Sequence, residues 1–165
     1  MDLKEQLNNN TEALLSKIGQ IADEQFHAKP DDETWSPAQV LEHLYRSEFG
    51  IPKLFMGEAE PDPDRDSEAI IEKMRKQFLE SDKKYKASGV ILPGEEKKSK
   101  EELTSNFRSL REKIAVLADQ FDSKEVCKAY EHPVYGYLTR EEWLNFNIIH
   151  TQRHMAQIDR ILQRL

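Results

Sequence analysis

Apolar residues recur at steps of three and four along most of this chain, which is the spacing of one face of an α-helix. The clearest run comprises Leu103, Phe107, Leu110, Ile114, Leu117 and Phe121. Runs with this period predict helices at about 2–27, 36–55, 67–85, 99–121 and 139–165. Most of the six glycines and seven prolines lie between the runs, which disfavours a sheet with many tight turns. The sequence therefore predicts an all-α protein.

Three of the five segments begin with the pattern of a capping box. In Ser36-Pro37-Ala38-Gln39 the serine oxygen can accept from the amide of Gln39, while the glutamine side chain reaches back to the serine amide. Pro37 suits the first helical position, where its missing N–H costs nothing. The same pattern is predicted for the pairs Ser99–Glu102 and Thr139–Glu142.

A length of 165 residues suits one domain spanning 1–165. Pro52 lies inside the second segment and should kink or break it. Four long helices with one split or partial helix predict a four-helix bundle. Residues 57–66 are expected to form a mobile, solvated acidic loop, and 89–99 another loop. Residues 122–138 form an irregular connection, and one of that length is often functional.

Charge and composition restrict the partners. Lysine and arginine number 24 and aspartate and glutamate 31, a formal charge of −7 that repels phosphate backbones. We therefore expect no nucleic-acid partner. The absence of a signal peptide or a run of about 20 apolar residues predicts no membrane association. Cys127 is the only cysteine, which suits a reducing compartment and predicts a cytoplasmic protein.

His150 and His154 are four positions apart, so they share one face of the last helix. Their ring nitrogens can converge on a point about 2 Å from each, as zinc or nickel requires. A third ligand must come from another segment, and the candidates are His27, His43 and His132. Geometry favours His43, because a mid-helix histidine can meet a mid-helix pair across the core.

Three neutral nitrogen ligands leave a coordination position open, as in catalytic rather than structural sites. Alternative interpretations remain for each residue. A histidine pair at this spacing often arises by chance, and a mid-helix histidine such as His43 is often a core residue. Glu24 with His27 resembles half of a di-iron motif, but a second copy is missing. Cys127 is interpreted as an incidental thiol.

Three stretches carry a resemblance to a known family. Residues 35–44 read Trp-Ser-Pro-Ala-Gln-Val-Leu-Glu-His-Leu, residues 132–143 contain His-Pro-Val-Tyr-Gly-Tyr-Leu-Thr followed by Glu-Trp, and residues 150–158 read His-Thr-Gln-Arg-His-Met-Ala-Gln-Ile. In this order they resemble the motifs of the DinB/YfiT-like superfamily, over residues 35–160.

The resemblance implies an up-down-down-up four-helix bundle with one metal ion held by His43, His150 and His154. It also implies a metal-dependent enzyme. Some members transfer low-molecular-weight thiols such as bacillithiol, mycothiol or glutathione, and others are labelled metal-dependent hydrolases without a proven substrate. Many members are homodimers, so a homodimer is a further expectation.

Our leading hypothesis is a metal-dependent transferase that holds a small thiol as thiolate for attack on an electrophilic small-molecule substrate. Zinc or nickel suits the nitrogen ligands best, and iron or manganese would also bind. The residues expected to line the pocket or orient ligands are Asn147, Arg153, Gln157 and Tyr135. Arg153 could instead form a surface ion pair. The alternatives are a hydrolase using metal-bound hydroxide and a non-catalytic metal- or ligand-binding stress protein.

Overall fold

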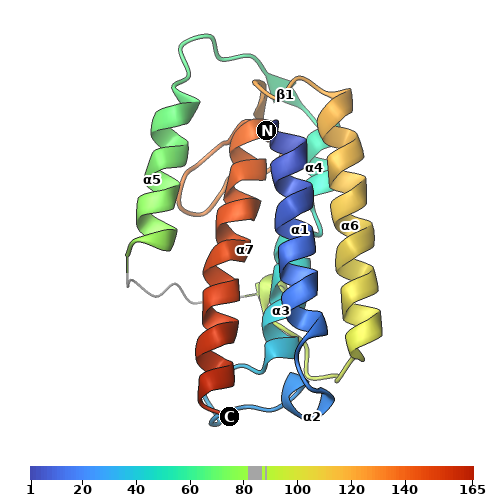
Figure 1. Ribbon diagram of the computed structural model, residues 1–165. Helices are drawn as coiled ribbons and strands as arrows, with labels where there is room; N and C mark the ends of the chain where they lie inside the picture. The colour runs from blue at the N-terminus through green and yellow to red at the C-terminus, as the bar shows by residue number, and fades with distance from the viewer. Residues whose placement is uncertain (82–86, 88) are drawn as a thin grey trace.

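The computed structural model describes residues 1–81, 87 and 89–165, and these form a predominantly helical structure (Figure 1). The α-helices are α1 (Leu3–Gly19), α2 (Asp23–Phe26), α3 (Pro37–Glu48), α4 (Ile51–Met56), α5 (Ser67–Leu79), α6 (Lys100–Gln120) and α7 (Arg140–Gln163). A 3-10 turn, η1, spans Gly89–Ile91, and two short strands are β1 (Ala59–Glu60) and β2 (Val126–Cys127).

Four helices make the bundle, namely α1, α3, α6 and α7. Figure 1 shows α1 and α7 beginning at the same end of the molecule and α3 and α6 running the opposite way. In chain order the directions are therefore up, down, down, up, which confirms the predicted fold. Helix α1 contacts both α6 and α7, and α3 contacts the same two helices, so each of the four has two bundle neighbours.

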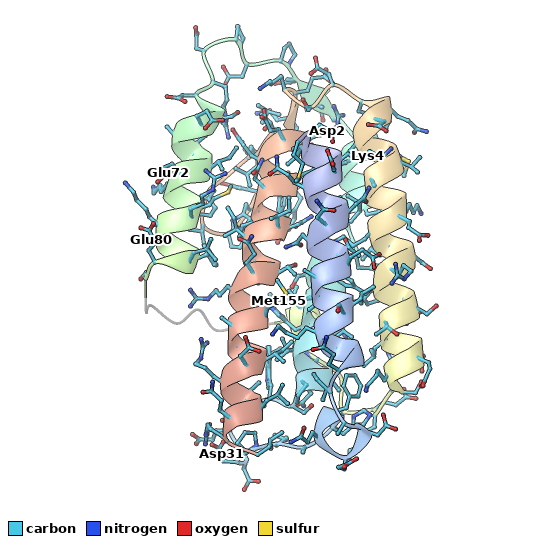
Figure 2. The ribbon with its side chains drawn as sticks, in the orientation of Figure 1. Asp2, Lys4, Asp31, Glu72, Glu80 and Met155 are labelled. Carbon is cyan, nitrogen blue, oxygen red and sulfur yellow. The ribbon has the colours of Figure 1, made fainter. Side chains whose placement is uncertain are left out.

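The third predicted segment, 67–85, lies outside the bundle, where α5 packs along α7 (Figure 1). Its buried residues are Ile71, Met74 and Phe78. Figure 2 shows Glu72 and Glu80 on the outer side of this helix, so its polar face is turned to solvent. The expected helical position of Tyr85 falls outside the described residues.

The predicted helix starts agree closely with the structure. Both hydrogen bonds of the capping box form at Ser36 and at Thr139. At Ser99 the side chain accepts from the amide of Glu102, but the described hydrogen bonds do not include the return bond. Helix α5 is capped by Asp66, whose carboxylate accepts from Ala69. Local sequence thus decides where these helices begin.

The predicted first helix, 2–27, is wrong in its length. Helix α1 ends at Gly19, and a separate turn, α2, follows from Asp23. Glycine favours helix ends. The change of direction after α1 lets Ile21 and Phe26 be buried in the part of the core that also contains Ile18 and Leu41. The predicted break near Pro52 is confirmed, because α3 ends at Glu48 and α4 begins at Ile51.

The acidic segment 57–66 is not a free, solvated loop, so that interpretation needs correction. Its strand β1 pairs antiparallel with β2, in the connection 122–138. Arg65 donates to both carboxylate oxygens of Glu142, at 2.9 and 2.7 Å, and Ser67 adds a third hydrogen bond. Glu142 is fully buried at the start of α7. Arg65 therefore holds this loop against the start of α7. The acidic composition of the segment gave no sign of this contact.

A buried arginine joins all four bundle helices. Arg111 of α6 is 1 % exposed and donates to both oxygens of Glu48 on α3, at 2.6 and 2.8 Å. It also donates to Asn10 and Thr11 of α1 and to Thr151 of α7. Burial raises the pKa of the Glu48 carboxyl, and Arg111 opposes that shift. All five N–H groups of the guanidinium are thereby used.

In the described part of the chain, every helix is too short or too polar to cross a membrane.

Candidate metal centre

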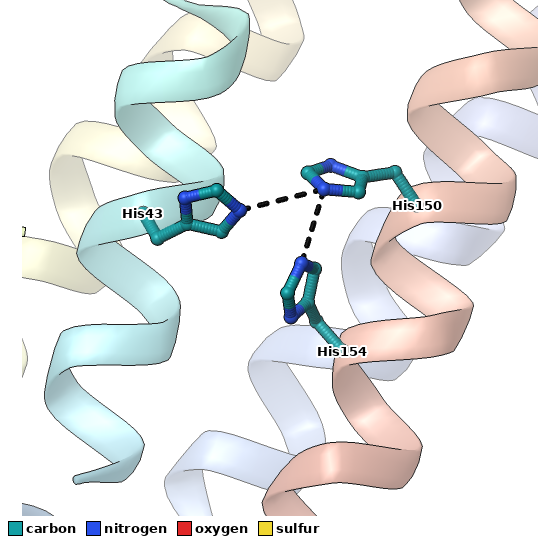
Figure 3. Close-up of side chains that lie close together, drawn as sticks. All are labelled: His43, His150 and His154. Atoms are coloured by element: carbon teal, nitrogen blue, oxygen red, sulfur yellow. Dashed lines mark hydrogen bonds between the residues drawn. The ribbon is translucent and has the colours of Figure 1, made fainter. Parts of the chain in front are cut away.

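Three histidines meet in the core of the bundle (Figure 3). His43 comes from α3, and His150 and His154 come from successive turns of α7. The Nε2 atom of His150 lies 3.4 Å from Nε2 of His43 and 3.0 Å from Nε2 of His154. Each residue contributes one ring nitrogen to a group whose members all lie within 4.8 Å of one another. Spacing along the sequence selected the same three residues.

The opposite ring nitrogens of two of these histidines are held by oxygen acceptors. Nδ1 of His43 lies 2.7 Å from the carbonyl oxygen of Ile91 in η1, and Nδ1 of His154 lies 2.6 Å from Oε1 of Gln157. A carbonyl oxygen only accepts, so Nδ1 carries the proton in both rings. Their Nε2 lone pairs are therefore directed to the point where the three rings meet.

This arrangement fits a divalent ion. Nitrogen ligands about 2.0–2.1 Å from a tetrahedral zinc ion lie roughly 3.3–3.4 Å from one another, close to the 3.4 and 3.0 Å found here. Nitrogen lone pairs directed at one another repel unless a proton or cation lies between them. Hydrogen bonds from the outer ring nitrogens to carbonyl oxygens are typical of metal-binding histidines. The three residues could thus hold one ion.

Aromatic rings surround the cluster. Phe146 stacks on His150, with ring centroids 5.2 Å apart and an interplanar angle of 16°, and Trp35 lies 5.1 Å from the ring of His43. Burial lowers the pKa of all three histidines, that of His154 to about 3. The pKa of His150 falls well below its ordinary value, first through burial and then through its histidine neighbours. The cluster is thus electrically neutral near pH 7, as ligands must be.

The two other candidate ligands lie elsewhere. His27 follows α2 and packs edge-on against Phe26. His132 is buried in the connection 122–138, where its Nδ1 accepts from the amides of Val134 and Tyr135, at 3.0 and 3.3 Å. Burial lowers the pKa of His132 to about 4. Neither residue belongs to the group of ring nitrogens formed by the cluster.

Of the four residues expected to line the pocket or orient ligands, Gln157 directly contacts a histidine of the cluster. Arg153 donates to the carbonyl oxygen of Phe78 near the end of α5, at 2.9 Å. The hydroxyl of Tyr135 donates to Gln77, also on α5, at 2.6 Å. Asn147 is buried on α7, one turn before His150. Their roles in binding or catalysis stay predictions.

Several contributors could not be found by looking for reactive side chains. The acceptor for His43 is a main-chain carbonyl, which any residue at position 91 would supply. Phe146 lies four positions before His150, so the helical period could have indicated their contact. Cys127 is fully buried, and burial raises the pKa of its thiol, which agrees with its interpretation as an incidental thiol.

The structure defines this chain as a helical bundle of up-down-down-up topology with a candidate three-histidine metal centre in its core. A family model for the DinB superfamily matches residues 5–158. The chain therefore belongs to the DinB superfamily.

Individual relatives agree with that assignment. The chain is 24 % identical over 145 residues to uncharacterized protein YuaE of Bacillus subtilis (strain 168), a match covering 88 % of each chain. Its fold is similar to that of YfiT from Bacillus subtilis, described as a probable metal-dependent hydrolase with an unusual four-helix bundle topology. That match has a TM-score of 0.60 and 18 % identity, and covers 98 % of this chain and 86 % of YfiT.

The four-helix bundle protein TT2238 is similar to the same degree. Its TM-score is 0.61 at 17 % identity, with 96 % of both chains covered. At these identities the two structures support the fold.

Proposed function

We propose that this chain is a metal-dependent enzyme that transfers a low-molecular-weight thiol to an electrophilic small molecule. Nε2 of His43, His150 and His154 would bind one divalent ion, zinc or nickel in the first instance. One observation carries the proposal. The three Nε2 atoms converge while carbonyl oxygens hold the outer nitrogens of His43 and His154.

When bound, the ion would supply Lewis-acid chemistry at an open coordination position and lower the pKa of a thiol that binds there. The residues of the chain would orient the ligands and keep water away. Ile91 and Gln157 fix two imidazoles, and the rings of Trp35 and Phe146 cover His43 and His150. Among the described residues the cluster includes no aspartate or glutamate. A thiol is acidic enough to need no such base.

Hydrolysis is the second candidate, and the similarity to YfiT supports it. Activation of water is commonly assisted by a general base. The carboxylate next to His43 in sequence belongs to Glu42, but it is buried and engaged by Arg46 and Lys98, at 3.1 and 3.3 Å. Because that carboxylate is occupied, we place thiol transfer first. A non-catalytic metal-binding protein is the third candidate.

The test begins with elemental analysis of the purified protein. The metal-loaded protein is then mixed with bacillithiol or glutathione and a chlorinated aromatic compound, and loss of the thiol is followed. We expect thiol consumption that depends on the ion and disappears in His43→Ala. The matched control is His27→Ala, whose histidine lies outside the cluster.

The three candidates give different results. Activity on esters or amides without any thiol would favour hydrolysis. Stoichiometric metal with no turnover of either kind would favour the non-catalytic protein, and a melting-temperature screen would then reveal its ligands. A small-molecule substrate, the absence of nucleic-acid and membrane partners, and a homodimer stay predictions.

A further inference from the structure

Two buried side-chain N–H groups in the described part of the chain have no hydrogen-bond partner, Nε1 of Trp143 and Nδ2 of Asn147. Both belong to α7. With His150 and His154 they occupy positions i, i+4, i+7 and i+11, which share one face of a helix. An unpaired buried donor costs about 1–3 kcal/mol. Such violations of a local rule are expected where a protein has a function to perform.

Asn147 is the nearer of the two to the histidines. A helix rises 1.5 Å per residue, so Asn147 precedes His150 by about 4.5 Å along the axis and Trp143 precedes it by about 10 Å. Trp143 also packs against His132, with ring centroids 5.2 Å apart. A small molecule bound at the three histidines could therefore reach the amide of Asn147, whereas the indole of Trp143 is too distant.

The position of Asn147 is held independently of its side chain. Its main-chain oxygen accepts a hydrogen bond from Arg111, at 3.5 Å. Arg111 also donates to the hydroxyl of Thr151, one turn further along α7. The residue is 2 % exposed, so bulk water does not serve its amide. The side chain thus carries a buried donor on the same face of α7 as His150 and His154, and no hydrogen bond in the described part of the chain explains its presence.

We infer that the side-chain amide of Asn147 donates a hydrogen bond to an oxygen atom of the thiol that binds at the metal centre. The inference rests on the proposed function and names the substrate class more closely. The preferred thiol carries a hydroxyl, carbonyl or carboxylate oxygen a few bonds from its sulfur. A purely aliphatic thiol leaves the amide unpaired, and sites built to hydrogen-bond a ligand discriminate against analogues that lack the polar group.

The test compares two thiols of nearly equal size, 2-mercaptoethanol and 1-propanethiol, in which a methyl group replaces the hydroxyl. Each is titrated calorimetrically into nickel-loaded protein. We expect the wild type to bind 2-mercaptoethanol about fivefold more tightly, the contribution of one ordinary hydrogen bond. The preference should vanish in Asn147→Leu, and also in Asn147→Ala, which introduces no additional bulk.

Thermal melting of the metal-free protein provides a second readout. Asn147→Leu should melt at or above the wild-type temperature, because it removes an unpaired buried donor. The matched control is Asn145→Leu on the same helix, where the amide donates to the main-chain oxygen of Glu141 at 2.9 Å. This variant should melt lower than the wild type and retain the thiol preference.

The outcomes separate the inference from the function on which it rests. Equal preference in wild type and Asn147→Leu, or a large loss of stability in metal-free Asn147→Leu, would overturn the role of Asn147 alone. Nickel-loaded wild type that binds neither thiol would contradict the proposed thiol chemistry and the inference together.

Discussion

At the scale of single residues, the cluster depends on which ring nitrogen each histidine uses. The sequence predicted the identities of the three histidines, because a pair at i, i+4 and a third mid-helix histidine restrict the choice. It could not predict that Ile91 fixes the ring of His43, since a main-chain acceptor leaves no mark in the sequence. Gln157 was predicted only as one of several candidates, and the structure distinguishes it by its 2.6 Å contact with His154.

The first prediction concerns the ligands. His43→Ala, His150→Ala and His154→Ala should each reduce the metal content of purified protein from near one ion per chain to a small fraction, because a two-nitrogen site binds weakly. Elemental analysis after dialysis measures this. His27→Ala should retain the ion. Full metal occupancy in His43→Ala would exclude this residue as the third ligand.

The second prediction concerns the support of a ligand. Gln157→Leu removes the acceptor for Nδ1 of His154 while leaving the three Nε2 atoms in place. Loss of such a partner typically lowers metal affinity by about 10–100-fold. Competition with a chromophoric chelator measures the change. The ring of His154 remains a ligand, so an affinity equal to that of the wild type would mean that its orientation is set by packing alone.

At the scale of secondary-structure elements, the starts of helices were more predictable than their ends. Ser36 and Thr139 carry caps whose chemistry is local. The end of α1 depends on burying Ile21 and Phe26, which requires knowledge of the folded core. Burial of Arg111 was likewise unpredictable, because a charged residue on an amphipathic helix normally faces solvent.

The third prediction concerns the link between elements. Arg111→Met leaves the carboxylate of Glu48 buried without its partner, so the free energy of unfolding should fall by about 3–5 kcal/mol in urea titrations. The double variant Arg111→Met/Glu48→Met should recover much of this loss, because it removes both charges. Arg108→Met, a variant on the same helix as Arg111, breaks an exposed pair with Glu12 of α1 and should change the free energy of unfolding little. A single variant no worse than the double would contradict the role of the buried pair.

At the scale of the whole molecule, the apolar period predicted the bundle and the family resemblance implied its direction pattern, while neither predicted the place of α5. The apolar period indicates that one face of a helix is buried, but it does not predict which other helix packs against that face. The pairing of segment 57–66 with 122–138 joins stretches more than sixty residues apart through β1 and β2, and two-residue strands are too short to leave a periodic signal.

The fourth prediction concerns the response of the metal-free molecule to acid. Burial lowers the pKa of His132 in the folded protein to about 4, from an ordinary value of 6.5. Between these values the unfolded chain binds the proton and the folded chain does not, so stability falls as the pH drops from 6.5 to 4. The shift is equivalent to roughly 3 kcal/mol.

Urea unfolding across this pH range, compared with His132→Asn, measures the contribution of that residue. The advantage of the wild type over the variant should shrink as the pH falls. The histidines of the cluster are buried in both proteins, so the effect of their burial is common to the two curves. A difference that stays constant with pH would assign the acid sensitivity to other groups.

The distance along the chain between His43 and His150, 107 positions, has a consequence for folding. Any ligand that holds both residues acts as a cross-link that closes a loop of that length. By the chain-entropy estimate used for disulfides, such a closure restricts the unfolded ensemble by about 4–5 kcal/mol. The pair on α7 alone spans one helical turn and offers no such restraint. Loading the centre would therefore cross-link α3 to α7 in a chain whose lone cysteine cannot form an internal disulfide.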